Sequence, residues 1–228
     1  MANKKIGITG HNGFLGTHLK NHIQYQFVNF EIIDFKRSFF EDEKKLSFFI
    51  DNCDVIIHLA GLNRHNSHEE ISNTNIQLAK TLGKSLTANN FKGCIIFSSS
   101  LQEFNSTPYG KSKKKASEIL AQSAKSGGFS YVKLIIPNIF GPFGKPYYNS
   151  FIATFSHQLI FREIPEIIKD EFIPLIYVED VVYSILDAIE LKGIHKKQVF
   201  PQIKKKSLSD TIPIKGFSAI LYRKREYS

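Results

Sequence analysis

The sequence predicts an α/β fold with a parallel sheet, because short apolar runs alternate with helix-length segments along most of its 228 residues. The apolar runs are continuous stretches of Ile, Val and Phe, which is expected of strands that helices cover on both faces. Hydrophobic residues make up 42% of the chain and charged residues 22%, as in ordinary globular domains. A chain of this length can bury a substantial core.

The first half of the chain alternates between strands and helices. KKIGIT is a short apolar run and predicts a strand at 4–9, and a glycine-rich turn leads from it into a helix at 13–25. FEIIDF predicts the second strand at 30–35, and DVIIHLA the third at 54–60. The long segment 67–90 is expected to be a helix.

The second half of the chain begins with the same alternation of strands and helices, which then becomes less regular. The expected elements are a strand at 93–100, a helix at 109–125, a strand at 130–137, a loop rich in Pro and Gly at 139–150, and short helices at 151–161 and 178–190. From Lys196 the sequence is basic and weakly patterned, and we assign no element to it.

The net charge of the chain is +9. This balance favours anionic partners, which include nucleotides and nucleotide-sugars as well as nucleic acids and lipid headgroups. The alternative is a solvated, lysine-rich surface without a partner. The basic residues are scattered and lack the interleaved aromatic residues that stack bases, so no nucleic acid partner is predicted.

The sequence indicates a cytoplasmic protein. No apolar run reaches the roughly 18–20 residues that a membrane span needs, so no membrane partner is predicted. The N-terminus lacks the apolar region and cleavage site of a signal peptide. Cys53 and Cys94 lie far apart, without a CxxC spacing or a histidine cluster, so we expect no metal site and a reduced compartment.

A glycine-rich turn follows the first strand. In GITGHNGFLGTHL, Gly10, Gly13 and Gly16 lie between that strand and the first helix. Glycines there permit a tight turn, a close approach of the backbone to a pyrophosphate, and close packing of helix on strand. The helix N-terminus adds free N–H groups and a positive dipole end. This strand–turn–helix context predicts a dinucleotide site in a Rossmann-like, doubly wound sheet.

The end of the second strand bears on the type of cofactor. Asp34 favours NAD, because its carboxylate accepts hydrogen bonds from both ribose hydroxyls and repels a 2′-phosphate. Lys36 and Arg37 follow at once and favour NADP, because they can hold that phosphate. A solvated loop is the alternative for these residues, and the residues alone leave the choice open.

Tyr109 and Lys113 form a Y-x-x-x-K pair in TPYGKSKKKASEIL, where four lysines occupy five positions. At about 100° per residue, the two side chains lie about 40° apart on one helix face. Lys111, Lys114 and Lys115 fall on the opposite face, where we expect solvent. A free tyrosine has a pKa of about 10, and a cation one helical turn away stabilises its phenolate. The pair therefore predicts acid–base chemistry at Tyr109.

A serine run, Ser98 to Ser100, ends the strand before this helix. A hydroxyl at this place can hydrogen-bond a substrate carbonyl while Tyr109 protonates it during hydride addition. We assign this function to Ser100. Capping of the strand end is the alternative, and it is favoured for Ser98 and Ser99.

These motifs together resemble the extended short-chain dehydrogenase/reductases of the NAD-dependent epimerase/dehydratase family, which act on nucleotide-sugars. TGHNGFLG is similar to the family's TGxxGFxG, PNIFGP (137–142) to its PNxYGP loop, and YVEDVV (177–182) to its late [FY]VxDV segment. Asn75 matches the Asn of the family's NVxGT helix, and HLAG (58–61) its segment beside the cofactor. The resemblance covers about residues 4–190.

The resemblance implies three sets of site residues and no metal. The catalytic residues are Ser100, Tyr109 and Lys113. The residues implied for the cofactor, which is NADP with NAD as the alternative, are Gly10, Asn12, Gly13, Phe14, Leu15, Gly16, Asp34, Lys36, Arg37, Leu59, Ala60, Gly61, Asn75, Ser98, Tyr109, Lys113 and Pro137. Those implied for the substrate are Asn63, Arg64, Ser100, Gln102, Asn138, Lys145 and Asn149.

Several stretches narrow the resemblance. HLAGLNR, SSSLQ, PYGKSK, PNIFGPFGKPYYNSFIATF and YVEDVV look like the reductases of the UDP-N-acetyl-L-fucosamine pathway in capsule and O-antigen synthesis. This implies reduction of the C4 ketone of a UDP-2-acetamido-2,6-dideoxy-hexos-4-ulose with NADPH. Those reductases also carry a C-terminal cupin domain that epimerises the sugar at C3. The sequence ends before one, so we do not expect epimerisation.

Two other functions stay open. One is a nucleotide-sugar epimerase or dehydratase with tightly bound NAD, for which Glu103 is a candidate acid–base group, although an adjacent Asp-Glu pair is missing. The other is a non-catalytic dinucleotide-binding relative.

We expect a single domain over 1–228. Its dinucleotide-binding core is formed by about 1–140 and 173–190, and its small C-terminal substrate lobe by about 141–172 and 191–228. The family resemblance also implies a homodimer that packs through the helices at 67–90 and 109–125.

Overall fold

A six-stranded parallel sheet forms the centre of the computed structural model, which describes residues 3–26, 29–165 and 173–200. The strand order is β2-β1-β3-β4-β5-β8. The strands are β1 (Lys4–Thr9), β2 (Phe30–Ile33), β3 (Val55–His58), β4 (Cys94–Ser100), β5 (Ser130–Ile136) and β8 (Ile194–Gln198). The predicted α/β fold with a parallel sheet is confirmed.

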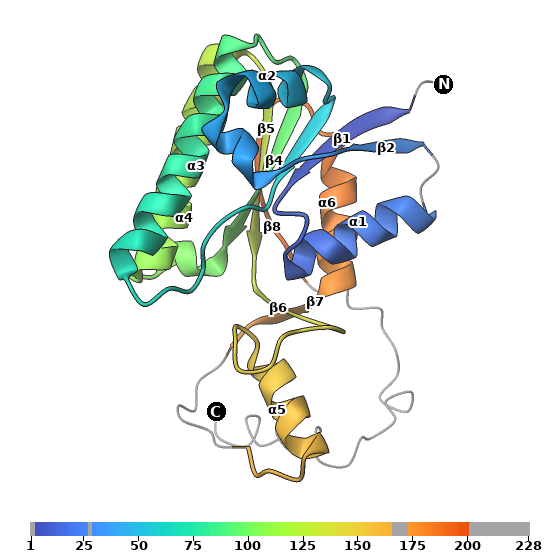
Figure 1. Cartoon of the computed structure of the whole chain (residues 1–228), viewed down its shortest axis with the longest axis vertical. Helices are drawn as coiled ribbons and strands as arrows, with labels where there is room; N and C mark the ends of the chain where they lie inside the picture. The colour runs from blue at the N-terminus through green and yellow to red at the C-terminus, as the bar shows by residue number, and fades with distance from the viewer. Residues whose placement is uncertain (1–2, 27–28, 166–172, 201–228) are drawn as a thin grey trace.

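Helices cover both faces of this sheet (Figure 1). They are α1 (Phe14–Gln26) and α6 (Val178–Ala188) on one face, and α2 (Glu43–Asp51), α3 (His68–Ala88) and α4 (Pro108–Gly127) on the other. Two apolar cores result, one on each side of the sheet. Leu19 of α1 and Ile185 of α6 belong to the first, and Leu82 of α3 and Leu120 of α4 to the second.

The order of the strands reverses at β1, and in a doubly wound sheet such a switch point is where a crevice for a ligand is expected. From β1 the chain passes through α1 to β2 on one side, and then returns through α2 to β3 on the other side of β1. In doubly wound sheets, ligands bind at the carboxyl ends of the two strands where the order reverses. Here those ends are Thr9 in β1 and His58 in β3, which are partners in the strand register.

The helix that carries the predicted Tyr–Lys pair has strong end signals. The side chain of Thr107 caps α4 by accepting a hydrogen bond from the Gly110 N–H at 3.1 Å, and Pro108 occupies the first helical turn. At the other end, Gly128 takes a left-handed conformation with φ of +71°. These signals fix where α4 begins and therefore which face Tyr109 presents.

Three elements that precede β5 were not expected from the sequence. They are α2 and two 3-10 turns, η1 (Arg37–Glu41) and η2 (Leu101–Phe104). The predicted loop at 139–150 also begins differently, because β6 (Asn138–Phe140) pairs with β7 (Leu175–Tyr177) in a separate two-stranded sheet. Beside this small sheet lies α5 (Phe151–Ile160), apart from the main sheet (Figure 1).

The strand β8 corrects part of the expected division of the chain. Residues 194–198 lie in the range assigned to the substrate lobe, but they pair with β5 at the edge of the main sheet. All five residues of β8, IHKKQ, are exposed. An exposed edge strand has no apolar face to produce a sequence signal, so this one was missed. The rest of the tail, from residue 201, lies outside the described residues.

The described ranges contain neither a membrane-spanning helix nor a cluster of metal ligands. None of the helices in them is long and apolar enough to cross a membrane. Within the same ranges, no three or more His, Cys, Asp and Glu side chains gather closely enough to hold a metal ion.

Candidate active site

The glycine-rich turn is packed as tightly as a phosphate-binding turn requires. Gly10 has φ of +78°, and a Cβ added to it would lie only 2.7 Å from the Ala60 backbone nitrogen. A Cβ on Gly16 would overlap the Gly10 carbonyl oxygen. The Gly13 N–H donates a hydrogen bond to that same carbonyl at 3.0 Å. The turn thus brings the predicted cofactor residues after β1 against those after β3, while Asn12 and Gly13 remain exposed.

The charged residues after β2 face solvent, while the phenylalanine among them does not. Phe35 is buried against Phe49, with 4.8 Å between ring centroids, and so anchors the chain at this point. Asp34, Lys36 and Arg37 on either side of it are exposed at the carboxyl end of β2, next to β1. Their position suits contact with the adenosine ribose, and both cofactor choices remain compatible with it.

The lysine cluster divides as helical spacing predicts. Lys113 is 4% exposed, whereas Lys111, Lys114 and Lys115 are all exposed. Lys115 forms a surface ion pair with Glu118 at 3.7 Å. Tyr109 is half-buried on the same side of α4 as Lys113. Only one lysine of the cluster therefore belongs to the site.

Burial changes the acid–base properties of the pair. It raises the pKa of Tyr109 to about 12, so the phenol holds its proton at neutral pH and is a weaker acid than a free tyrosine, the opposite of the shift expected from a neighbouring cation. Burial also lowers the pKa of Lys113 to about 7, and the negative charge of Glu103 opposes this shift. The ammonium of Lys113 lies 4.4 Å from the centroid of the Phe97 ring, a cation–π distance.

Thr9, His58 and Phe97 line up across three neighbouring strands beneath Lys113. The Nδ1 atom of His58 lies 2.7 Å from Thr9 Oγ1, and its ring stacks on Phe97 with centroids 5.7 Å apart. Burial, and next the charge of Lys113, lower the pKa of His58 to about 3. His58 is therefore neutral. Sequence reasoning missed these contacts, although a histidine ending a buried strand was the available signal.

Asn75 is buried, and both of its side-chain N–H groups are used within the protein. Its Nδ2 donates to the Leu62 carbonyl at 2.8 Å and to Ser112 Oγ at 2.9 Å, and its Oδ1 accepts from the Leu62 N–H at 2.7 Å. Ser112 in turn donates to the carbonyl of Tyr109 at 2.7 Å. Asn75 thus ties the segment after β3 to the start of α4, and its predicted contact with a cofactor stays a prediction.

The three serines that end β4 have different partners. Ser98 Oγ donates to the His58 carbonyl at 3.3 Å, and Ser99 is buried and donates to Glu103. Ser100 Oγ accepts from the Gln102 N–H at 3.2 Å and so caps η2. We expected Ser98 and Ser99 to act as caps, but the serine that caps a turn here is Ser100. Since Ser100 is the acceptor in this bond, its hydroxyl hydrogen can be donated to a substrate.

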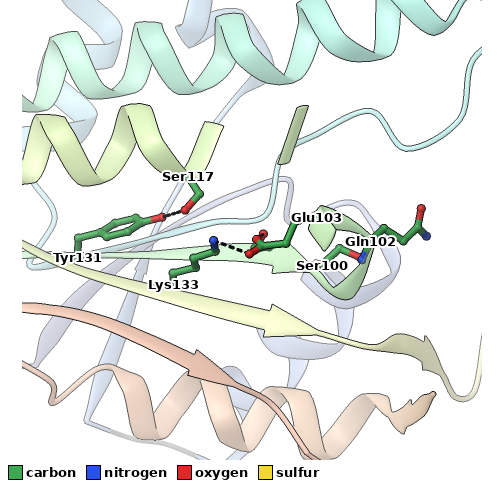
Figure 2. A network of polar contacts seen from close by, with 7 residues as sticks. Ser100, Gln102, Glu103, Ser117, Tyr131 and Lys133 are labelled. Carbon is green, nitrogen blue, oxygen red and sulfur yellow. Dashed lines mark hydrogen bonds and ion pairs between the residues drawn. The ribbon is translucent and has the colours of Figure 1, made fainter. Parts of the chain in front are cut away.

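Glu103 is committed to partners inside the protein (Figure 2). Its Oε1 atom lies 2.7 Å from the ammonium of Lys133 on β5, and its Oε2 atom accepts from Ser99. Both members of the ion pair are buried. A carboxylate held in this way does not supply the free acid–base group that a dehydratase needs at this point.

Several residues predicted to bind substrate gather around Tyr148, which the sequence reasoning missed. The Arg64 guanidinium donates to the carbonyls of Tyr147, at 3.3 Å, and of Tyr148. The Tyr148 hydroxyl donates to Asn63 at 3.5 Å, and Lys145 lies 5.5 Å from its ring centroid. A tyrosine pair within a Pro- and Gly-rich loop was the only signal for this cluster.

Several other predicted residues lie around the same end of the sheet or beside it. Gln102 lies in η2 beside Ser100, and its side chain is half-buried. Pro137 is buried at the end of β5, while Asn138 in β6 and Asn149 before α5 are exposed. Leu59 packs against the core on the α1 side of the sheet.

The fold, the glycine turn and the switch point at β1 define a dinucleotide-binding α/β protein of the doubly wound class. Residues 6–200 match the NAD dependent epimerase/dehydratase family, and the chain belongs to that family. This agrees with the resemblance inferred from its motifs.

Individual relatives narrow the comparison. The chain is 33% identical over 202 residues to the UDP-2-acetamido-2,6-beta-L-arabino-hexul-4-ose reductase of Pseudomonas aeruginosa. The aligned region covers 87% of this chain and 53% of that protein. It is 32% identical, with a TM-score of 0.69, to the capsular polysaccharide assembling protein CapF of Staphylococcus aureus, over 85% of this chain and 53% of that one. The chain thus spans about half the length of these two relatives.

A third likeness concerns the fold alone. The structure of RMD from Pseudomonas aeruginosa complexed with NADPH has a TM-score of 0.74 and 19% identity, over 86% of this chain and 77% of that one. At this identity the likeness supports the architecture of the sheet and its helices.

Proposed function

We propose that the chain is an NADPH-dependent reductase, with NAD(H) as the alternative cofactor, of the C4 ketone of a UDP-2-acetamido-2,6-dideoxy-hexos-4-ulose. The observation that carries the proposal is the inward-facing Tyr109–Lys113 pair, whose helix starts directly after the turn that holds Ser100. The reductase activity in the name of the 33% identical relative supports the choice of substrate.

Each catalytic residue has one task in this reaction. The bound nicotinamide cofactor supplies the hydride that adds to C4 of the sugar. Tyr109 donates its proton to the carbonyl oxygen, so the ketone becomes an alcohol and the tyrosine is left as a phenolate. The ammonium of Lys113 stabilises that phenolate, and Ser100 orients the carbonyl by donating a hydrogen bond to it.

The cofactor would lie across the carboxyl ends of β1 and β3. The glycine-rich turn would let the diphosphate approach the backbone, and the free N–H groups in the first turn of α1 would hold it, as a helix N-terminus holds an anion. We assign the 2′-phosphate of NADP to Lys36 and Arg37, which are both exposed beside it. Asp34 would then contact the ribose from the neighbouring position.

The substrate would bind between this core and the segment around α5. Asn63, Arg64 and Lys145 converge on the loop that contains Tyr148, and Lys145 is the candidate partner for the sugar-nucleotide diphosphate. Asn138, Asn149 and Gln102 complete the proposed substrate set. We propose that α5 and the segments beside it form the substrate lobe, with β8 as part of the dinucleotide-binding core.

The biological setting follows from the same relatives. We propose a cytoplasmic enzyme of capsule or O-antigen sugar synthesis, with a UDP-sugar and no nucleic acid as its partner. We further propose a homodimer through α3 and α4, the long helices that pack side by side on one face of the sheet (Figure 1). Sedimentation equilibrium on the purified chain tests the oligomeric state.

Turnover by Tyr109→Phe tests the reductase. We expect oxidation of NADPH with the keto sugar to fall at least about 100-fold, with NADPH affinity unchanged, because only the donated proton is lost. Tyr25→Phe, an exposed position on α1, is the matched control and should keep full activity. Full turnover by Tyr109→Phe would contradict the role of Tyr109. Tightly bound NAD without net cofactor consumption would instead indicate a redox-neutral epimerase.

A further inference from the structure

One carboxylate joins three elements under the proposed catalytic residues. Glu103 lies in η2, receives a hydrogen bond from Ser99 at the end of β4, and pairs with Lys133 in the middle of β5 at 2.7 Å. Figure 2 shows the carboxylate next to the Lys133 ammonium, with Ser100 and Gln102 close by on the turn. The position of this turn therefore depends on Glu103.

The same carboxylate stands among buried positive charges. Of the residues that the structure describes, the buried lysines are Lys113 and Lys133, and the only buried carboxylate is that of Glu103. Lys133 is the register partner of Phe97, whose ring contacts the ammonium of Lys113. The side chains of both lysines thus lie on the same face of the sheet, and one carboxylate offsets their two positive charges.

We propose that Glu103 is a positioning residue of the reductase: it fixes the turn that carries Ser100 and offsets the positive charge beside Tyr109. This inference rests on the proposed function. Glu103 does not contact the reacting atoms, because its two oxygens are bonded to Lys133 and Ser99. It acts through the groups that do.

The ionisable groups that surround Lys113 come from four elements. They are His58 on β3, Glu103 on η2, Tyr109 on α4 itself and Lys133 on β5. His58 is neutral, Tyr109 holds its proton, and Lys133 is already paired. Glu103 is therefore the group that favours the charged form of Lys113, against the effect of burial.

A separate hydrogen bond joins α4 to β5 near this network. The hydroxyl of Tyr131, two residues before Lys133 on β5, donates to Ser117 of α4 at 3.0 Å (Figure 2). This bond holds α4 on β5 without involving Glu103. Removal of the Glu103 charge should therefore leave the helix in place and change only the turn and the field at Lys113.

A double-mutant cycle distinguishes an effect of Glu103 on catalysis from its effect on the stability of the protein. Glu103→Gln and Lys133→Met each leave a buried partner without its counter-charge, and we expect each to lower the melting temperature by about 5–15 °C. The double variant is neutral and should recover most of that loss. Its kcat should nevertheless remain at least about tenfold below the wild-type value, with the KM for NADPH within about twofold, because the turn that carries Ser100 has lost the ion pair that fixes it. Recovery of kcat together with the melting temperature would overturn the proposal.

A second measurement needs no substrate. The titration midpoint of Lys113 can be followed by the NMR signal of its ¹³C-labelled Cε, identified by its loss in Lys113→Met. We expect the midpoint to be lower by about one pH unit in Glu103→Gln than in the wild type, because an adjacent anion is gone while Lys133 keeps its charge. Equal midpoints would overturn the proposal. This readout stands even if the wild-type chain does not reduce the keto sugar, so the two proposals can fail separately.

Discussion

The ammonium of Lys113 lies 4.4 Å from the centroid of Phe97, and this contact defines how the site is built. Phe97 is in the central strand β4, and Lys113 reaches it from the second turn of α4. The ring gives the cation a favourable electrostatic surface while burial disfavours its charge. The charge of Lys113, the proposed catalytic lysine, therefore depends on opposing effects that small changes in its surroundings can shift.

Replacement of Lys113 should cost far more activity than replacement of its neighbours. We expect Lys113→Met to lower kcat about 100-fold or more, because the phenolate left on Tyr109 would have no cation beside it. Lys115→Met is the matched control on the same helix, since Lys115 is exposed and paired only with Glu118. Steady-state NADPH oxidation measures both. Equal losses in the two variants would contradict the assignment of Lys113.

Activity should fall as the pH rises through neutrality. The pKa of Lys113 is lowered to about 7, so its charged form is present below that pH and is lost above it. Tyr109 has a pKa of about 12 and remains protonated throughout. We expect kcat/KM to be level on the acid side and to decline about tenfold per pH unit above about 7. A profile that stays level up to pH 9 would show that Lys113 is charged over the whole range.

His58 should make the protein sensitive to acid. Its pKa is about 3 in the folded state against 6.5 for a free histidine, so unfolding takes up a proton between these values. Stability contributed by the neutral ring is therefore present above about pH 6.5 and is lost as the pH falls. In His58→Phe, which keeps an aromatic ring on Phe97, we expect this acid loss to shrink by a few kcal/mol in urea titrations at several pH values.

Thr9, the neighbour of His58 on β1, provides a control for this experiment. Thr9→Val removes the hydroxyl partner of His58 but leaves a titratable ring in place. It should lower stability at all pH values and retain the acid dependence. If His58→Phe and the wild type lose stability in parallel on acidification, other groups cause the loss.

Arg64 should affect the substrate and leave the cofactor unaffected. Its guanidinium binds the carbonyls of Tyr147 and Tyr148, so Arg64→Met should loosen this loop and raise the KM for the sugar about tenfold. The KM for NADPH and the melting temperature should hardly change, because the residue is exposed. Arg64→Lys distinguishes the cause: a wild-type KM in that variant would show that charge, and not the forked geometry, is what matters.

The sequence was informative where spacing or turn chemistry sets the structure. The glycines between β1 and α1, and the four-residue interval from Tyr109 to Lys113, could be interpreted directly because helical and turn geometry leave few alternatives. β8 could not be found, because an exposed edge strand has no apolar pattern. The pairing of Glu103 with Lys133 depends on two elements that meet only in the folded chain, and a lone lysine within the apolar run of β5 was the one hint.

One row of residues across the sheet has a consequence for folding. Thr9, His58, Phe97 and Lys133 are successive register partners on β1, β3, β4 and β5, so the floor beneath Lys113 is a single cross-section of four strands. A slip of one residue in any strand would turn its member of the row to the opposite face. The site can therefore exist only when the chain from Thr9 to Lys133 has paired in full. Recovery of catalysis during refolding should then coincide with the pairing of these four strands and should not precede it.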